Sequence, residues 1–152
     1  RGPAIARGAA LVSAAILLGA GPVTTPSPGA ASPSSDDTQW AVFDRGAIAR
    51  AVAAGETVFV DVTAAWCLTC KANKALTLDR EPVASALIDP GVMPMRADWT
   101  RPDPTIARYL ESHDRFGIPF NVVYGPAAPE GLTLPEILTP GAVLDAIEKA
   151  GG

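Results

Sequence analysis

The chain has 152 residues, of which 48% are hydrophobic and 18% are charged. This length suits one domain with a sizeable core plus an appendage, and the composition is typical of a globular protein rather than a disordered one. All 16 acidic residues follow residue 35, where ten basic residues accompany them and give a net charge of −6. This balance argues against nucleic acid or anionic lipid as a partner.

An apolar segment lies within residues 1–20. Residues 9–20 (AALVSAAILLGA) are apolar or small throughout, and Arg1 and Arg7 precede them. Twelve residues are fewer than the roughly 20 that a complete transmembrane helix needs. Two interpretations stay open, namely the hydrophobic part of a signal peptide or the end of a transmembrane helix with its arginines on the cytoplasmic side. Because the first residue is Arg, we expect the chain to be a fragment or a processed product.

Residues 21–38 (GPVTTPSPGAASPSSDDT) are rich in Pro, Ser, Gly and Thr and have almost nothing to bury. This composition predicts a flexible linker and argues against residues 1–20 being a buried core helix. The apolar segment, its basic flank and the linker together predict that the folded part, residues 39–152, lies on the far side of a membrane.

The folded part is predicted to alternate strands and helices. The predicted helices cover residues 44–54, 67–78, 82–88, 104–112 and 142–149, the first with Asp44 as N-cap and Gly55 as terminator. The predicted strands cover residues 57–63, 92–97, 120–124 and 132–138. Residues 57–63 (TVFVDVT) suit a central strand covered on both faces. The order predicts an α/β fold with a mixed central sheet flanked by helices.

The two cysteines form one C-x-x-C motif, which follows the strand 57–63 and opens the helix 67–78. The first turn of a helix presents free backbone N–H groups and the positive end of the helix dipole, which stabilise a thiolate there. Cys70 lies one turn further on the same side and can attack a mixed disulfide formed at Cys67. We therefore predict that Cys67 is the entering nucleophile and Cys70 the resolving thiol.

The sequence supports other functions of this cysteine pair less well. A zinc site needs four ligands, usually two C-x-x-C pairs or one pair with two histidines, whereas this chain has two cysteines and one histidine. Copper(I) held by the two thiolates is the metal-binding alternative. A purely structural disulfide in so small a loop removes little entropy from the unfolded chain. We expect no metal and no cofactor beyond the Cys67–Cys70 disulfide.

The segment VFVDVTAAWCLTCK, together with Gly117-Ile118-Pro119, resembles a thioredoxin domain. More narrowly, residues 40–150 resemble the C-terminal extracytoplasmic domain of DsbD-type thiol:disulfide interchange proteins, including their copper-tolerance relatives. This narrower resemblance rests on less specific motifs, namely CLTCK, ADWT at 97–100 and residues 134–139. The resemblance implies a thioredoxin-like fold and a disulfide reductase. The reductase would pass electrons from the membrane domain of the same polypeptide to disulfides of extracytoplasmic redox proteins, in the periplasm at a bacterial inner membrane.

The resemblance also assigns several further residues to the site. Asp61 lies inside an apolar strand, so burial is expected to raise its pKa, and the resemblance implies that it takes the proton of Cys70. The alternative is an Asp that reaches solvent at a sheet edge. The resemblance also implies a cis Ile118–Pro119 bond beside Cys67, with the Ile118 backbone available to an extended substrate. Trp66 is expected to shield the site and to offer a flat contact surface.

The chain departs from the family pattern in two places. Leu68-Thr69 stands where Gly-Pro is usual in thioredoxins, and Lys71 and Lys74 stand where some DsbD-type domains carry an acidic residue. His113 is expected to be solvated at a helix end, without a catalytic role. Two rival functions remain: a membrane-anchored thioredoxin-like protein that reduces apocytochrome c cysteines or acts as an oxidant, and a non-enzymatic copper(I)-binding module.

Overall fold

The computed structural model describes Gly2 and residues 39–152. The segments interpreted from the sequence as a membrane segment (1–20) and a linker (21–38) therefore lie, apart from Gly2, outside the described residues. Within the described part, no helix combines the length and the apolar character that a membrane span requires.

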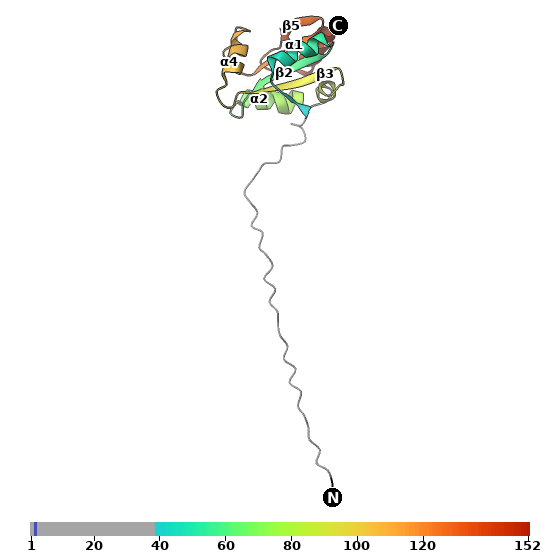
Figure 1. The fold of residues 1–152 in the computed structure, drawn as a ribbon, viewed down its shortest axis with the longest axis vertical. Coiled ribbons are helices and arrows are strands. Elements are labelled where there is room, and N and C mark those ends of the chain that lie inside the picture. Colours follow the sequence, from blue (N-terminus) through green and yellow to red (C-terminus); the bar gives the residue numbers. More distant parts are fainter. Residues whose placement is uncertain (1, 3–38) are drawn as a thin grey trace. The chain divides into compact units, whose positions relative to one another are not determined.

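Residues 39–152 form one five-stranded sheet with helices on both faces (Figure 1). The strands are β1 (Ala41–Val42), β2 (Thr57–Thr63), β3 (Val92–Asp98), β4 (Phe120–Gly125) and β5 (Ala128–Thr133). The helices are α1 (Arg45–Ala53), α2 (Leu68–Asn73), α3 (Val83–Leu87), α4 (Pro104–Glu111) and α5 (Pro140–Gly151), and a π-helical segment, η2 (Lys74–Leu78), continues α2 directly.

The sheet is mixed, as the sequence predicts. Its strand order is β1-β3-β2-β4-β5, in which β1, β3 and β2 run parallel, β4 is antiparallel to β2, and β5 is antiparallel to β4. β2 is the central strand, with a hydrogen-bonded neighbour on each side. This position fits its run of β-branched and apolar residues, because both of its faces are covered.

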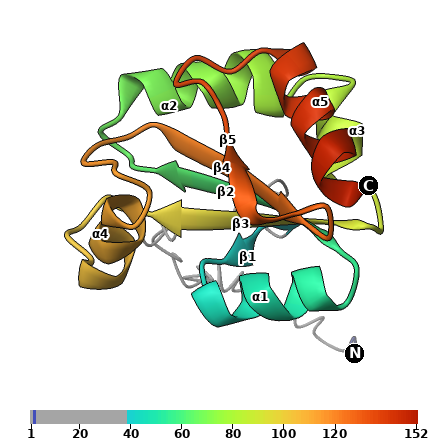
Figure 2. The ribbon, with the colours of Figure 1, turned by 90° about the horizontal axis from the view of Figure 1, so that it is seen from above.

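The two faces of the sheet bury different clusters, and β2 contributes to both because its side chains alternate. Val58, Val60 and Val62 pack with α1 and α4 on one face, whereas Phe59 packs with η2, α3 and α5 on the other. Figure 2 shows the same division, with α2, α3 and α5 on one side of the sheet and α1 and α4 on the other. Asp61 therefore faces the layer that contains the cysteine-bearing helix.

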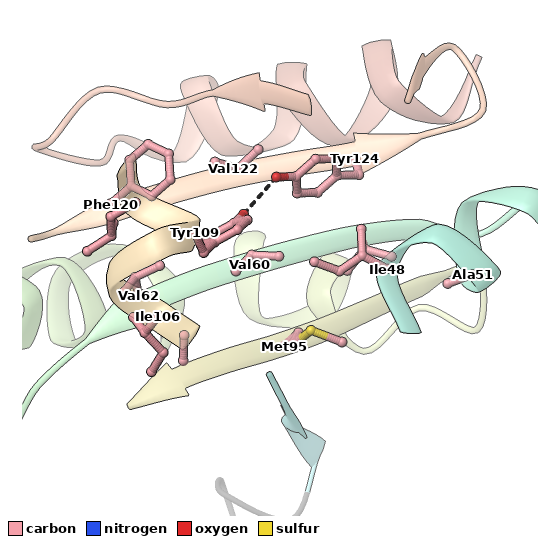
Figure 3. Close-up of a cluster of buried hydrophobic side chains, with 13 residues drawn as sticks. Ile48, Ala51, Val60, Val62, Met95, Ile106, Tyr109, Phe120, Val122 and Tyr124 are labelled. Carbon is pink, nitrogen blue, oxygen red and sulfur yellow. Dashed lines mark hydrogen bonds between the residues drawn. The ribbon is translucent and has the colours of Figure 1, made fainter. Parts of the chain in front are cut away.

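The first cluster contains a short chain of polar groups (Figure 3). The hydroxyls of Tyr109 and Tyr124 lie 2.7 Å apart, and the Tyr124 hydroxyl lies 2.8 Å from His113 Nε2. The His113 ring also contacts Tyr109 and Phe120, with ring centroids 4.9 and 5.2 Å apart. The expectation that His113 is solvated holds only in part, because the side chain is half-buried where the helix end lies against β4. Burial, followed by the charge of Arg45, lowers the pKa of His113.

The last predicted strand is displaced. The sequence predicts a strand over 132–138, but β5 covers Ala128–Thr133. Gly131 within it has a φ of +88°, and a Cβ at that position would collide with the side chains of Tyr124 and Val122. Beyond β5, Leu134 still donates a backbone hydrogen bond to Asn121, but Pro135 has no N–H with which to continue the ladder. The two-residue β1 is too short to leave a pattern in the sequence.

The segment 134–139 instead holds the cysteine-bearing helix in place. The Asn73 side chain donates to the Glu136 carbonyl over 2.7 Å and accepts from the Leu138 N–H over 3.0 Å. The Thr77 hydroxyl donates to the Leu138 carbonyl over 3.0 Å. Asn73 and Thr77 are both buried, so these bonds replace contacts with water that neither side chain can make.

Replacing Asn73 tests this anchor. Asn73→Ala leaves the buried Leu138 N–H without its acceptor, so we expect the free energy of unfolding to fall by about 1–3 kcal/mol. Leu76→Ala, at a side chain on the same helical run that is 69% exposed, is the control and should change stability by less than about 0.5 kcal/mol. Urea unfolding followed by circular dichroism measures both. Equal stability of the two variants would show that the anchor contributes nothing.

Candidate active site

Cys67 stands at the N-terminus of α2, in the loop that leaves the end of β2. It is the N-cap residue, with an extended backbone (φ −83°, ψ 104°), and its Sγ accepts a hydrogen bond from the Cys70 N–H over 3.1 Å. The two cysteines form a disulfide with a Cα–Cα distance of 5.3 Å. An N–H of the first helical turn thus already points at the sulfur of Cys67. The same donor would stabilise a thiolate at that atom after reduction.

Both cysteines are nearly covered, with exposed fractions of 6% for Cys67 and 5% for Cys70. They pack with Ala64, and the partly buried Ile118 lies against this small cluster. The Ile118–Pro119 bond is cis, and Ile118 lies beside the cysteines, as the family resemblance implies. A second cis bond, Glu81–Pro82, occurs between η2 and α3, where the sequence carried no signal for it.

Trp66 precedes Cys67 and remains 60% exposed. Its indole Nε1 donates to the Thr100 carbonyl over 3.3 Å, and the neighbouring Ala65 N–H donates to the Thr100 hydroxyl over 2.8 Å. Leu68, on the other side of Cys67, is 78% exposed. An apolar surface therefore borders the disulfide, although a role of Trp66 in substrate contact stays a prediction.

Asp61 lies in the central strand, between two polar residues at the same level of the sheet. The strand register pairs it with Arg96 on β3 and with Asn121 on β4. Asn121 Nδ2 donates to Asp61 Oδ1 over 3.0 Å, and Arg96 Nε lies 3.7 Å from Asp61 Oδ2. Asp61 is only 6% exposed, so the alternative of a solvent-exposed Asp at a sheet edge is wrong. The carboxyl is buried with partners on both sides.

Burial raises the pKa of Asp61, and this effect outweighs four opposing ones. These are, from the largest, the hydrogen bond from Asn121, the charges of Arg96 and Lys74, and a hydrogen bond from Arg96. The carboxylate therefore binds a proton more readily than an exposed one does, which suits a proton acceptor in exchange. The side chain also lines a cavity of about 690 Å³, whose walls include Ala64, Lys71, Lys74 and Arg96.

Sequence reasoning missed both partners of Asp61. Arg96 lies in the cavity wall, and its guanidinium lies over the Trp40 ring, 4.3 Å from the centroid. The sequence does show a polar residue inside each of two apolar strands, Arg96 in β3 and Asn121 in β4. Their proximity to Asp61, however, follows only from the register of the sheet. Among residues 39–152 and Gly2, no three His, Cys, Asp or Glu side chains are grouped as a metal ion would need. The absence of a cofactor stays a prediction.

A protein-family model described as thioredoxin-like matches residues 40–126. The chain belongs to the thioredoxin-like family. A comparison with curated proteins finds no match. This thioredoxin-like domain combines the family fold with a C-x-x-C disulfide at the start of a helix, which makes it a thiol–disulfide oxidoreductase.

Solved structures share the fold of this thioredoxin-like domain. The oxidised C-terminal domain of Neisseria meningitidis DsbD is 22% identical with a TM-score of 0.56, over 70% of this chain and 91% of that one. A thioredoxin from Thermus thermophilus is 19% identical with a TM-score of 0.52, over 72% and 85% of the two chains. The first thioredoxin domain of mouse protein disulfide-isomerase A4 is 18% identical with a TM-score of 0.52, over 82% and 89%.

Because the pKa of Asp61 is raised in the folded state, the stability of the protein should depend on pH. A carboxyl whose pKa is higher in the folded state favours folding most at low pH, below its unfolded value near 3.8, and this contribution is lost as pH rises through the folded pKa. Asp61→Asn removes the buried charge and keeps the shape. We therefore expect it to raise the free energy of unfolding at pH 7, with a gain that shrinks towards pH 4.

Urea unfolding of the oxidised protein at several pH values measures this gain. Asp145→Asn, which removes an exposed carboxylate on α5, is the control and should change stability by less than about 0.5 kcal/mol. A loss of stability in Asp61→Asn at pH 7 would contradict the prediction, because it would mean that the ionised carboxylate stabilises the fold.

Proposed function

We propose that this domain is a protein-disulfide reductase of the DsbD type. It receives electrons from a membrane domain of the same polypeptide and delivers them to disulfides of extracytoplasmic redox proteins. The observation that carries the proposal is the Cys67–Cys70 disulfide at the N-terminus of α2, on the side of the sheet where Asp61 is buried. The fold likeness to the Neisseria meningitidis DsbD C-terminal domain supports the subfamily.

The exchange proceeds in two steps from the reduced domain. The Cys67 thiolate attacks one sulfur of the partner's disulfide, so a Cys67–partner bond forms and the partner's other sulfur leaves as a thiolate. Cys70 then gives its proton to Asp61 and attacks Cys67 Sγ, which forms the Cys67–Cys70 bond and releases the second partner sulfur. The partner gains two electrons, and the domain loses two.

Substrate contact is proposed for the surface around the disulfide. Trp66 and Leu68 offer exposed apolar side chains on either side of Cys67, and Ile118 lies against the cysteine cluster. An extended segment of the partner, lying along Ile118 and Pro119, would pair with the Ile118 backbone and bring its disulfide to Cys67. Such main-chain pairing would accept partners of different sequence.

The proposed location is the periplasmic side of a bacterial inner membrane. The apolar residues 9–20 behind Arg1 and Arg7, followed by the linker 21–38, support a tether that leaves the folded part outside the cytoplasm. Soluble periplasmic redox proteins and the membrane domain that precedes the tether are the proposed partners. Disulfides persist in this compartment, so a reductase has substrates there.

Trapping of mixed disulfides tests the order of the two cysteines. In Cys70→Ala the first attack is unaffected but the resolving step is absent, so partners should stay bound to Cys67. Expression in a bacterial periplasm should give high-mass bands on non-reducing gels that disappear with reductant. Mass spectrometry should identify them as extracytoplasmic redox proteins or a membrane thiol–disulfide domain.

Cys67→Ser is the matched variant. It should form no adducts, and its reduction of insulin should fall by at least about a hundredfold, because no thiolate remains to attack. Adducts that appear in a Cys67→Ala protein and not in Cys70→Ala would reverse the two roles. Insulin reduction that survives Cys67→Ser would overturn the proposed function itself.

A further inference from the structure

Asn121 is the most deeply buried polar residue beside the site. It lies in β4, is 1% exposed, and faces Asp61, whereas its neighbours Phe120 and Val122 point into the opposite core. Asn121 Nδ2 donates to Asp61, but Asn121 Oδ1 has no hydrogen-bond partner among the residues that the structure describes. A buried amide with an unused acceptor costs stability, and Asn is disfavoured within strands. Packing alone therefore gives no reason for an amide at this position.

We propose that Asn121 is a positioning residue for the exchange reaction, whose amide holds the Asp61 carboxyl in place and pairs with it in both of its protonation states. This inference rests on the proposed function, because it assigns Asn121 to the proton transfer between Cys70 and Asp61.

The geometry supports both pairings. In the structure the amide nitrogen donates to Asp61 Oδ1 over 3.0 Å, which is the arrangement that a carboxylate requires. Rotation about the last side-chain bond exchanges the amide nitrogen and oxygen. The oxygen then occupies the place of the nitrogen, at a separation that suits an O–H···O bond from a protonated carboxyl. Since Asn121 Oδ1 has no other partner in the described part, no hydrogen bond to that atom opposes the rotation.

The proton transfer from Cys70 creates a buried hydroxyl on Asp61 that needs a hydrogen-bond acceptor. When Cys70 gives up its proton, the Cys70 S–H bond breaks and an Asp61 O–H bond forms in a buried place. A buried hydroxyl without an acceptor costs free energy, and after the rotation Asn121 Oδ1 accepts its hydrogen bond. The amide nitrogen then takes the place of an atom that had no hydrogen-bond partner in the described part. When Asp61 later releases the proton towards the cavity that it lines, the amide turns back and donates to the carboxylate.

Other charged or ionisable side chains belong to the elements around Asp61, and Cys70 is ionisable once the disulfide is reduced. Arg96 approaches from β3, Lys74 from η2, and Lys71 and Cys70 belong to α2. Asp98 and Asp103 line the same cavity from the end of β3 and the start of α4. Burial raises the pKa of Asp61, and the bond from Asn121 is the largest effect that lowers it. Loss of the amide should therefore shift the activity profile towards higher pH.

The test compares insulin reduction from pH 5 to pH 9 in the wild type and in Asn121→Leu, which keeps the side-chain volume. We expect the variant to be about tenfold slower at pH 7 and to approach the wild-type rate at pH 9, because a smaller fraction of Asp61 is ionised at neutral pH. Val123→Ala, at a buried apolar residue of the same strand, is the control: it should lower stability without moving the profile. An unmoved profile in Asn121→Leu would overturn the proposal.

A second measurement separates this inference from the proposed function. In the oxidised wild type, NMR should show the Asn121 side-chain amide signals and the Asp61 carboxyl carbon changing with the same midpoint. Amide signals that stay constant while Asp61 titrates would overturn the inference, whether or not Asn121→Leu folds. If the wild type fails to reduce insulin but the two groups titrate together, the proposed function is wrong and the pairing with both protonation states stands.

Discussion

A carboxyl group buried in the central strand is the constraint around which the site is arranged. Asp61 occupies β2, the central strand of the five-stranded sheet, and burial raises its pKa. Burying a carboxylate costs free energy, and Asn121 and Arg96 offset part of that cost because they lie at the same level on the two adjacent strands. The same strand then leads directly to Cys67, so its position fixes the proton-binding group and the disulfide relative to each other.

The position of the two cysteines also depends on the contacts that fix α2. Its first turn must keep the Cys70 N–H directed at Cys67 Sγ, and the helix is too short to fix itself by its own hydrogen bonds. Asn73 and Thr77 bind it to the segment 134–139, and Leu78 packs in the same cluster as α5. The π-helical η2 thus continues α2 into a part of the core that supports it.

Much of this arrangement was predictable from local patterns in the sequence. The run TVFVDVT indicates a doubly covered strand, the C-x-x-C motif after it indicates a helix start, and an acid within that run indicates a buried carboxyl. Asn121 and Arg96 were missed because their relation to Asp61 depends on strand register across distant parts of the chain. Likewise, the position of β5 depends on its pairing with β4, and the packing of His113 depends on the direction in which α4 ends. No local pattern in the sequence encodes either.

The central claim is that the Cys67–Cys70 pair acts as an electron donor to other protein disulfides. Equilibration of the domain with glutathione buffers at pH 7, followed by thiol labelling, measures the reduction potential of this pair most directly. The account predicts a potential more negative than about −200 mV, in the range of proteins that reduce disulfides. A potential near about −120 mV, typical of a strong disulfide oxidant, would contradict it.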